Sequence, residues 1–302
     1  MDFYETALSI GTVERETGLS KDVLRKWEIR YGFPNPDRDT KGERVYPAEQ
    51  VARLRQIKHL MGLGHRPSKL MNLSQSELSD LAAHKTIPAG GSVTGAFVEE
   101  ILTLLRAHDP ASLKGRLGRL LQEQGLRLFV QDTAEPVSIV VGEAWARGEL
   151  QVFEEHLYSE VMHNLLRGTL EPLNSPSGKP RVLMTTVPEE GHSLGLLMAA
   201  SSLVLGGAHC IYLGPQMPID DIGNAARAHN ANVVALSFST AYPRRRVLPV
   251  LLELRQRLSP AVEIWAGGMG VRHLAEPGDG IHILATPDQL ESVMSQWIEN
   301  KS

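Results

Sequence analysis

Residues 182–207 read VLMTTVPEEGHSLGLLMAASSLVLGG, and this stretch decides the fold of the C-terminal part of the chain. Residues 182–187 are an apolar run with β-branched members, which predicts a buried parallel strand. The polar turn at residues 188–191 follows, and an apolar segment with helical spacing then runs to Gly206-Gly207. Because ligands bind at the carboxyl ends of parallel strands, this strand-loop-helix unit predicts a binding loop at the turn.

The loop carries the pattern Glu190-x-His192-x-x-Gly195. A histidine can ligate a metal through one ring nitrogen while a nearby carboxylate binds the other ring N–H and fixes its tautomer. A glycine at this point lets a bulky group approach the backbone closely. The pattern therefore makes His192 a candidate metal ligand supported by Glu190 and Gly195. The alternative interpretation is an ordinary surface histidine.

This pattern resembles the cobalamin-binding module shared by methionine synthase, several mutases and some regulators, whose usual motif is Asp-x-His-x-x-Gly. Glu190 stands where that family has Asp. Ser237-Phe238-Ser239 corresponds to the family's Ser-x-Leu, with Ser239 in place of Leu, and Gly267-Gly268 corresponds to its later glycine pair. The resemblance implies that Ser237, Ser239, Gly267 and Gly268 line the slot that takes the nucleotide tail of cobalamin.

The strand expected at residues 182–187 is the first of several in the segment 181–302. Similar apolar runs recur at 209–213, 233–238, 262–266 and 281–285, and helical stretches separate them. This alternation predicts an α/β, flavodoxin-like (Rossmann-type) domain with a five-stranded parallel sheet and helices on both of its faces.

Composition sets the remaining bounds on this chain of 302 residues. Its length allows two or three domains, and its formal charge of −4 gives no indication about nucleic acid. The single cysteine, Cys210, excludes a disulfide framework within one chain, which agrees with a cytoplasmic location. No signal peptide and no apolar run of membrane-spanning length is visible, so no membrane partner is expected.

The N-terminal part predicts two short helices joined by a glycine turn. A helix over residues 8–18 with Ser9 as its cap is followed by Gly18-Leu19-Ser20, and Ser20 caps a second helix over 21–31. Such a pair indicates helix-turn-helix, whose second helix enters the major groove of DNA. A further helix is expected over 48–63. The alternative is a solvated helical domain whose basic residues balance its acids.

The string LRKWEIRYG at 24–32 and the segment Arg44-x-Tyr46 resemble the winged-helix DNA-binding domain of the MerR family. The resemblance implies a domain over residues 1–73, a core that contains Leu24 and Trp27, and double-stranded operator DNA as a partner. Phosphate contacts position such a domain, and a few side chains read base edges. The candidates for DNA contact are Arg25, Lys26, Arg30, Tyr31, Lys41, Arg44 and Tyr46.

Residues 74–92 are largely polar and have no sustained heptad, so they predict a linker that has room for a short helical turn, and they give no support to dimerisation through a coiled coil. Residues 93–173 repeat apolar side chains at helical spacing in four segments, which predicts a four-helix bundle with a break or kink at Pro136. A second linker is expected at 174–180.

The bundle carries Trp145 and, nine residues later, Glu155-His156. Plain packing beside a solvated pair would account for these residues. However, the pattern is similar to the Trp-x9-Glu-His signature of the light-responsive, cobalamin-dependent MerR-type repressors of the CarH or LitR group. That resemblance implies that Trp145, Glu155 and His156 cover the upper face of the corrin. Ala146 stands where light-responsive members have a histidine after the tryptophan, which puts the light chemistry in doubt.

Together these patterns predict a non-enzymatic, cobalamin-dependent transcriptional repressor that responds to light. By resemblance, its cofactor is adenosylcobalamin, with methylcobalamin as the other form, and its assembly is a homo-oligomer, a tetramer in the family. Three alternatives stay open. One is a regulator that senses corrinoid level or another ligand without light, one binds no cobalamin, and one is a corrinoid methyl carrier.

Overall fold

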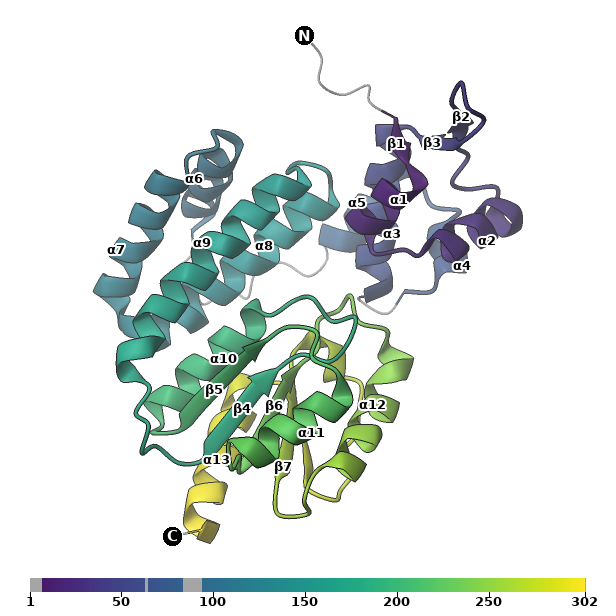
Figure 1. The fold of residues 1–302 in the computed structure, drawn as a ribbon. Helices are drawn as coiled ribbons and strands as arrows, with labels where there is room; N and C mark the ends of the chain where they lie inside the picture. Colours follow the sequence, from purple (N-terminus) through teal and green to yellow (C-terminus); the bar gives the residue numbers. More distant parts are fainter. Residues whose placement is uncertain (1–6, 63–64, 84–93, 302) are drawn as a thin grey trace.

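The computed structural model describes residues 7–62, 65–83 and 94–301, which form an N-terminal unit, a helical bundle and a parallel-sheet domain. Figure 1 shows the sheet domain beneath the other two units, with the bundle and the N-terminal unit side by side above it. The three-part organisation expected from the sequence is therefore present.

The N-terminal unit begins with the two short helices expected from the sequence, α1 (Ile10–Thr17) and α2 (Lys21–Tyr31). The Ser9 side chain accepts a hydrogen bond from the Thr12 amide, and Ser20 caps α2 in the same way through the Val23 amide. Antiparallel strands β1 (Leu8–Ser9), β3 (Arg44–Tyr46) and β2 (Asp37–Arg38) form the wing in that order. Helix α3 (Ala48–Gly62) follows.

Two further helices complete this unit, α4 (Pro67–Leu70) and α5 (Gln75–Ala83). The sequence predicted a linker from residue 74 with a short helical turn inside it, whereas α5 is a packed helix of 9 residues. Leu78 is fully buried against the core of the N-terminal unit, so α5 is packed although its composition is polar. The rest of the expected linker lies outside the described residues.

The bundle consists of four helices, α6 (Gly95–Arg106), α7 (Pro110–Phe129), α8 (Glu135–Ala146) and α9 (Val152–Leu170). The break expected at Pro136 occurs earlier. Gly125 is non-helical (φ 75°), and a π-helical turn, η1 (Val130–Ala134), separates α7 from α8. Pro136 follows this turn directly, in the first turn of α8, and the residue before α8, Ala134, is itself helical.

The C-terminal domain is the five-stranded parallel sheet that the sequence predicted, with strand order β5-β4-β6-β7-β8. The order is that of flavodoxin-like folds, in which the site lies at the switch point beside the first strand. The strands are β4 (Arg181–Thr185), β5 (His209–Gly214), β6 (Val233–Ser237), β7 (Glu263–Gly267) and β8 (Ile281–Leu284).

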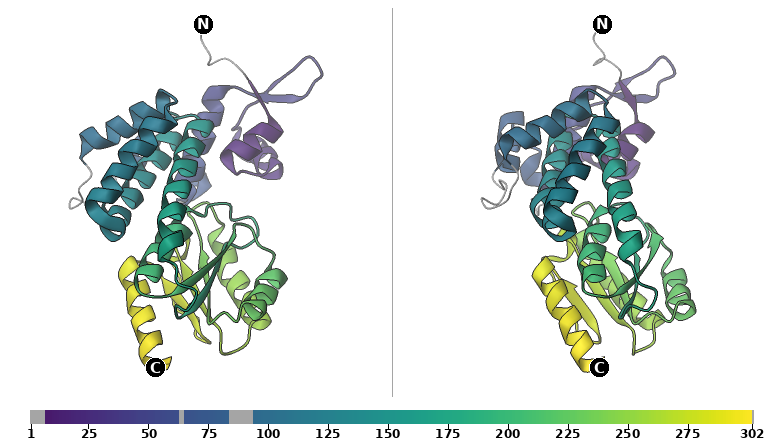
Figure 2. Two further views of the ribbon diagram at one scale, coloured as in Figure 1. Left: turned by 60° about the vertical axis from the view of Figure 1, so that its left-hand side comes forward. Right: turned by 90° about the vertical axis from the view of Figure 1, so that its left-hand side faces the viewer.

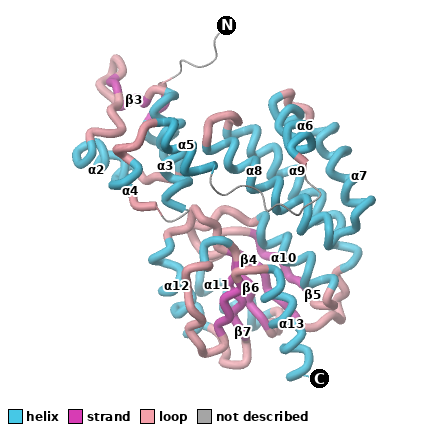
Figure 3. The backbone as a smooth tube through the Cα atoms, turned by 180° about the vertical axis from the view of Figure 1, so that it is seen from behind, coloured by secondary structure: helices cyan, strands magenta, loops and turns pink. Residues whose placement is uncertain are grey.

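Helices cover both faces of this sheet, as Figures 1 and 3 show. Buried side chains of α10 and α13 share one core with the bundle, and those of α11 and α12 form a second core on the opposite face. The short η2 (Glu171–Leu173) leads from α9 towards the sheet, and η3 (Met269–Val271) follows β7. The bounds are α10 (Leu194–Leu205), α11 (Ile219–Ala228), α12 (Arg244–Arg257) and α13 (Pro287–Lys301).

The bundle and the sheet domain are packed together through α9, which lies against α10 (Figure 2). One apolar core contains side chains of the bundle, of α10 and α13 and of the sheet, so the bundle lies on the side of the sheet that α10 and α13 cover. Within the described ranges, no helix has the length and apolar character needed to cross a bilayer.

Candidate functional site

The loop after β4 is organised around the carboxylate of Glu190, which is almost completely buried. Oε1 of Glu190 accepts hydrogen bonds from the backbone amide of His192 at 2.9 Å and from its Nδ1 at 2.8 Å. Oε2 accepts from the amide and the hydroxyl of Ser239, each at 2.8 Å. Four donors therefore surround one acceptor-only side chain, and they fix the His192 ring with its Nδ1–H towards Glu190.

The two titratable groups of this pair shift in opposite directions. Burial works to raise the pKa of Glu190, but the hydrogen bonds and charge of His192 and the amide of Ser239 outweigh it, so this pKa is lowered. The hydrogen bond to Glu190 raises the pKa of His192 against the effect of burial, and the charges of Glu190 and Glu155 act in the same direction. Glu155 of the bundle is thus within electrostatic range of His192.

The outer edge of the His192 ring is open. Its side chain is 66% exposed, and within the described parts of the chain its Nε2 has no hydrogen-bond partner. A neutral imidazole held through Nδ1–H in this way presents the Nε2 lone pair, which is the usual histidine arrangement for binding a metal.

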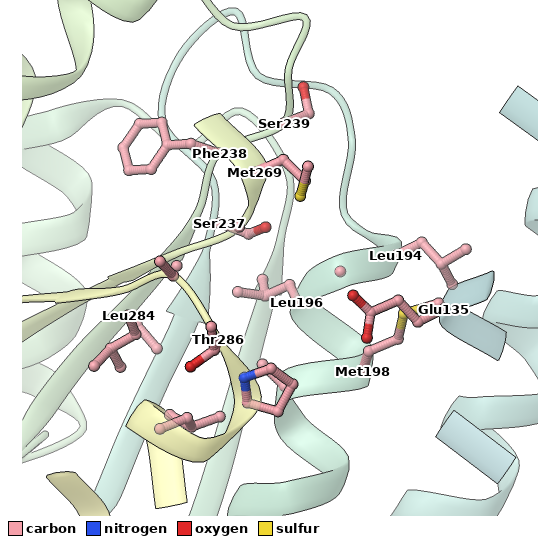
Figure 4. Close-up of a pocket in the computed structure, with 18 of the residues that line it drawn as sticks. Glu135, Leu194, Leu196, Met198, Ser237, Phe238, Ser239, Met269, Leu284 and Thr286 are labelled. Carbon is pink, nitrogen blue, oxygen red and sulfur yellow. The ribbon is translucent and has the colours of Figure 1, made fainter. Parts of the chain in front are cut away.

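His192 lies on the wall of a cavity of about 400 Å³ between the sheet domain and the bundle. In Figure 4, Ser237 and Ser239 lie on the sheet side, and Glu135 extends from the bundle beside Met198 of α10. Its walls are mostly apolar, as in sites for organic cofactors. The expected residues on its walls are His192, Gly195, Ser237, Ser239, Gly267 and Gly268.

Glycines keep this cavity open where the backbone comes close. A Cβ at Gly268, which has a φ of 94°, would lie 2.5 Å from the carbonyl oxygen of Phe238. A Cβ at Gly195 would lie 3.3 Å from the hydroxyl oxygen of Ser237. The slot beside β6 and β7 thus requires glycine at one position and has little spare room at the other.

The three bundle residues singled out from the sequence are not on the cavity wall. Glu155 binds the neighbouring His156 at Nδ1 (2.8 Å) and the hydroxyl of Ser159 (2.8 Å). Trp145 lies near the end of α8, and its Nε1 is shielded from solvent without a partner among the described residues. Ala146, which directly follows Trp145, is buried.

Sequence reasoning missed the contribution of other bundle side chains to this site. Gln131, Glu135 and Ser138 line the cavity, and His163 of α9 binds the Ser193 hydroxyl through Nε2 at 3.0 Å. No motif marks these residues, since single polar side chains on amphipathic helices are common on solvated faces.

The candidate DNA-binding surface is the exposed face of α2 together with the wing. Arg25, Lys26, Arg30 and Lys41 are exposed, and Tyr31 and Arg44 are partly buried. The expectation that Tyr46 contacts DNA is wrong, because its side chain is fully buried. Its hydroxyl donates to Glu28 at 2.7 Å, and Arg44 Nε donates to the same carboxylate at 2.9 Å, so Tyr46 helps to hold the wing.

The residues present fit a metal that arrives inside a macrocycle better than a bare ion. Within the described ranges, no group of three or more His, Cys, Asp or Glu side chains could hold a metal ion. A single oriented histidine beside a deep apolar slot can instead supply one axial ligand to a metal whose other ligands belong to the cofactor.

Comparisons with known proteins agree with this geometry. Residues 8–77 match the MerR HTH family regulatory protein model, and residues 98–167 and 180–283 match two B12 binding domain models. The fold and the site therefore define a MerR-type DNA-binding regulator with B12-binding domains.

The relatives give the class more detail. The chain is 29% identical over 275 residues to the HTH-type transcriptional repressor CarH of Myxococcus xanthus, which covers 89% of this chain and 91% of CarH. It is 28% identical to the repressor CarA of the same organism, with 88% of each chain covered. The monomethylamine corrinoid protein of Methanosarcina barkeri shares the fold of 66% of this chain and 96% of its own, with a TM-score of 0.51 and 16% identity.

Proposed function

We propose that this protein is a cobalamin-dependent transcriptional repressor that responds to light and whose oligomeric state is set by adenosylcobalamin. The observation that carries the proposal is the Glu190–His192 pair at the edge of an apolar cavity between two B12-binding domains. Similarity to the CarH and CarA repressors over most of the chain supports the regulatory role. The regulator acts on DNA in the cytoplasm and catalyses no reaction.

In this proposal, His192 would ligate the cobalt of cobalamin, with its ring held by Glu190, which Ser239 binds in turn. Ser237, Gly195, Gly267 and Gly268 form the slot for the nucleotide tail. Trp145, Glu155 and His156 would cover the cofactor from the bundle side, where an indole would give apolar cover and a carboxylate would accept hydrogen bonds from ribose hydroxyls. When bound, adenosylcobalamin supplies a photolabile cobalt–carbon bond.

The DNA-binding side of the proposal rests on the second helix of the helix-turn-helix. Arg25, Lys26, Arg30 and Tyr31 of α2, with Lys41 and Arg44 of the wing, contact operator DNA. Several copies of the N-terminal unit in one homo-oligomer, a tetramer by similarity to the family, bind one operator with a gain in affinity through avidity. If light changes the bound cofactor, the interaction that favours the assembly would be lost.

An absorption titration with adenosylcobalamin, in the dark and after green light, tests this function directly. The protein is expected to shift the cobalamin spectrum and retain the cofactor through gel filtration, and His192→Ala is expected to weaken both. Unchanged spectra and retention in His192→Ala would reject axial ligation. Size-exclusion profiles recorded dark and illuminated are expected to differ in mass, and identical profiles would remove the light switch.

One observation favours a second candidate function. Ala146 is a buried alanine and cannot ligate cobalt after loss of the upper ligand. A regulator that senses corrinoid level without light would bind adenosylcobalamin and methylcobalamin alike. Its assembly and its affinity for DNA would be the same in the dark and after illumination.

A further inference from the structure

One face of α3 lies in the seam between the N-terminal unit and the two B12-binding domains. Val51, Leu54 and Ile57 of this helix fill the core of its own unit. The adjacent face, with Ala52, Arg55, Lys58 and His59, points outwards from that core, since residues three and four apart share a helix face. Figure 1 shows α3 between the end of α8 and the loops above α12.

The first contact of this face is with the end of α8, at Trp145, which is a candidate cover for the corrinoid. The Arg55 guanidinium lies over the Trp145 ring, 6.0 Å from its centroid, and is oriented from behind by an ion pair with Glu16 of α1. An arginine over an indole is an attractive arrangement, and it strengthens when the pair is shielded from water, as Arg55 is here.

Next to this pair, the backbone of α3 at Ala52 comes close to the backbone just after α8 at Gly148. A Cβ built at Gly148 would lie 3.6 Å from the Cβ of Ala52, in ordinary van der Waals contact. The pKa of His59 is lowered by burial and by the charge of Arg147, so the seam excludes water at this point as well.

The second contact of the same face is with the sheet domain, at the loop after β6, whose Ser239 binds Glu190. Lys58 Nζ donates to the carbonyl oxygen of Ala241 at 3.3 Å, two residues after Ser239. Burial lowers the pKa of Lys58 while the charge of Glu190 opposes this shift, so its ammonium group lies within electrostatic range of the buried carboxylate. One helix therefore contacts Trp145 through Arg55 and, through Lys58, the residue Ala241, whose amide donates to the Ser239 hydroxyl beside Glu190.

We propose that this face of α3 is an intramolecular docking surface whose partner is the corrinoid site, so that docking of the DNA-binding unit and corrinoid binding are energetically linked. The inference rests on the proposed function and adds a route for its regulation. A corrinoid that is seated against Trp145 and His192 changes the surroundings of both docking contacts, and linkage requires that docking changes corrinoid affinity by the same factor. This route operates within one chain and does not depend on assembly.

A reversible lock on the seam tests the linkage in the full-length chain. The Ala52→Cys, Gly148→Cys double variant places two cysteines whose Cβ atoms lie 3.6 Å apart, within the range found in disulfides. Cys210 does not interfere, because burial raises the pKa of its thiol to about 12. Ala52→Cys with Gly148→Ala is the matched control, since it carries the same strain at the left-handed Gly148 (φ 79°) without a partner thiol.

The readout is the adenosylcobalamin affinity in the dark, titrated by absorbance for the oxidised and the reduced double variant at monomer concentrations. The expected result is an intramolecular disulfide on a non-reducing gel and an affinity that differs at least threefold between the two redox states, with no such difference in the control. A difference below threefold, or failure of the disulfide to form in the folded protein, would overturn the proposal.

A second variant opens the seam instead of closing it. Ala52→Glu places a charged side chain against Gly148 and is expected to change corrinoid affinity at least threefold in the direction opposite to the lock, whereas Glu49→Ala on the exposed first turn of α3 leaves it unchanged. If the disulfide lock and Ala52→Glu changed corrinoid affinity in the same direction, that result would contradict the linkage. If no form binds any corrinoid, the proposed function itself fails; if all forms bind equally, only the linkage fails.

Discussion

The imidazole of His163 on α9 connects the bundle to the loop of the candidate axial ligand, because its Nε2 lies 3.0 Å from the hydroxyl oxygen of Ser193. The other ring nitrogen, Nδ1, lies 2.7 Å from the carbonyl oxygen of Ser159, which can only accept. Nδ1 therefore carries the proton, and Nε2 accepts from the Ser193 hydroxyl. Ser193 directly follows His192, so this hydrogen bond positions the loop relative to the bundle.

We expect His163→Ala to loosen the loop and to lower the free energy of unfolding by about 1–3 kcal/mol, because the ring loses two hydrogen bonds. Hydrogen exchange of the amides at residues 189–193 should speed up in this variant. His108→Ala is the matched control, since His108 binds Glu154 within the bundle and does not contact the loop. Equal exchange at residues 189–193 in wild type and His163→Ala would show that the hydrogen bond does not hold the loop.

Glu190→Gln gives a sharper test of the loop, because all four groups around this side chain donate hydrogen bonds. An amide has two N–H donors on one side, so the backbone N–H of either His192 or Ser239, neither of which can accept, would face another donor. Leaving buried polar groups unsatisfied costs about 1–3 kcal/mol, so the urea midpoint should fall clearly.

The neighbouring residue is a control for this prediction. Glu189 is exposed and forms one ion pair with Arg246, so Glu189→Gln should change the free energy of unfolding by less than about 1 kcal/mol. Similar losses in Glu189→Gln and Glu190→Gln would refute the view that the buried carboxylate organises the loop.

The fold could be predicted from the sequence because its signals are local. The five strands are short apolar runs, the caps Ser9 and Ser20 precede their helices directly, and the Glu190–His192 pair is two residues apart. The structure confirms each of these elements. The packing of α5 was not predicted because the segment is largely polar, with only Leu78 and Leu81 packed against the core and with side-chain hydrogen bonds that join Gln75 and Ser79 to the distant Gln56.

The parts that could not be predicted are contacts between distant segments. Ser239 was expected to face the nucleotide slot, but its hydroxyl and amide also bind Glu190, 49 residues earlier, because β4 and β6 are neighbours in the sheet. Tyr46 carries the signal of an exposed wing residue, but its ring is part of the core of the N-terminal unit and its hydroxyl bonds to Glu28, 18 residues earlier. The contacts of α3 with the two other domains are made by Arg55 and Lys58, and charged side chains at these positions look in the sequence like an ordinary solvated helix face.

Two glycine substitutions should separate stability from cofactor binding. Gly268→Ala places a Cβ 2.5 Å from a backbone oxygen at a positive φ, so it should lower the free energy of unfolding by about 1–3 kcal/mol. Gly195→Ala lies in the first turn of α10, where alanine favours the helix, and its Cβ meets only the Ser237 side chain. We expect Gly195→Ala to keep the urea midpoint and to lower corrinoid affinity in an absorbance titration. Unchanged affinity would show that the slot beside Ser237 is not occupied by cofactor.

Because Lys58 is partly buried, we expect the free energy of unfolding to depend on pH in the alkaline range. Burial lowers its pKa in the folded chain below the ordinary value of 10.5, although Glu190 opposes the shift. Between these two values the unfolded chain binds more protons than the folded chain, so the contribution of Lys58 to the free energy of unfolding rises with pH across this window. Below the folded pKa, the buried ammonium group costs stability.

Lys58→Met removes this dependence and keeps the length of the side chain. Relative to wild type, the variant should gain free energy of unfolding at pH 7, and the gain should shrink as the pH approaches 10.5, in urea titrations at several pH values. Lys69→Met, on the exposed face of α4, is the control and should give a difference that does not change with pH. If the difference between Lys58→Met and wild type were the same at pH 7 and at pH 10.5, the ammonium group would be solvated and α3 would not be docked as described.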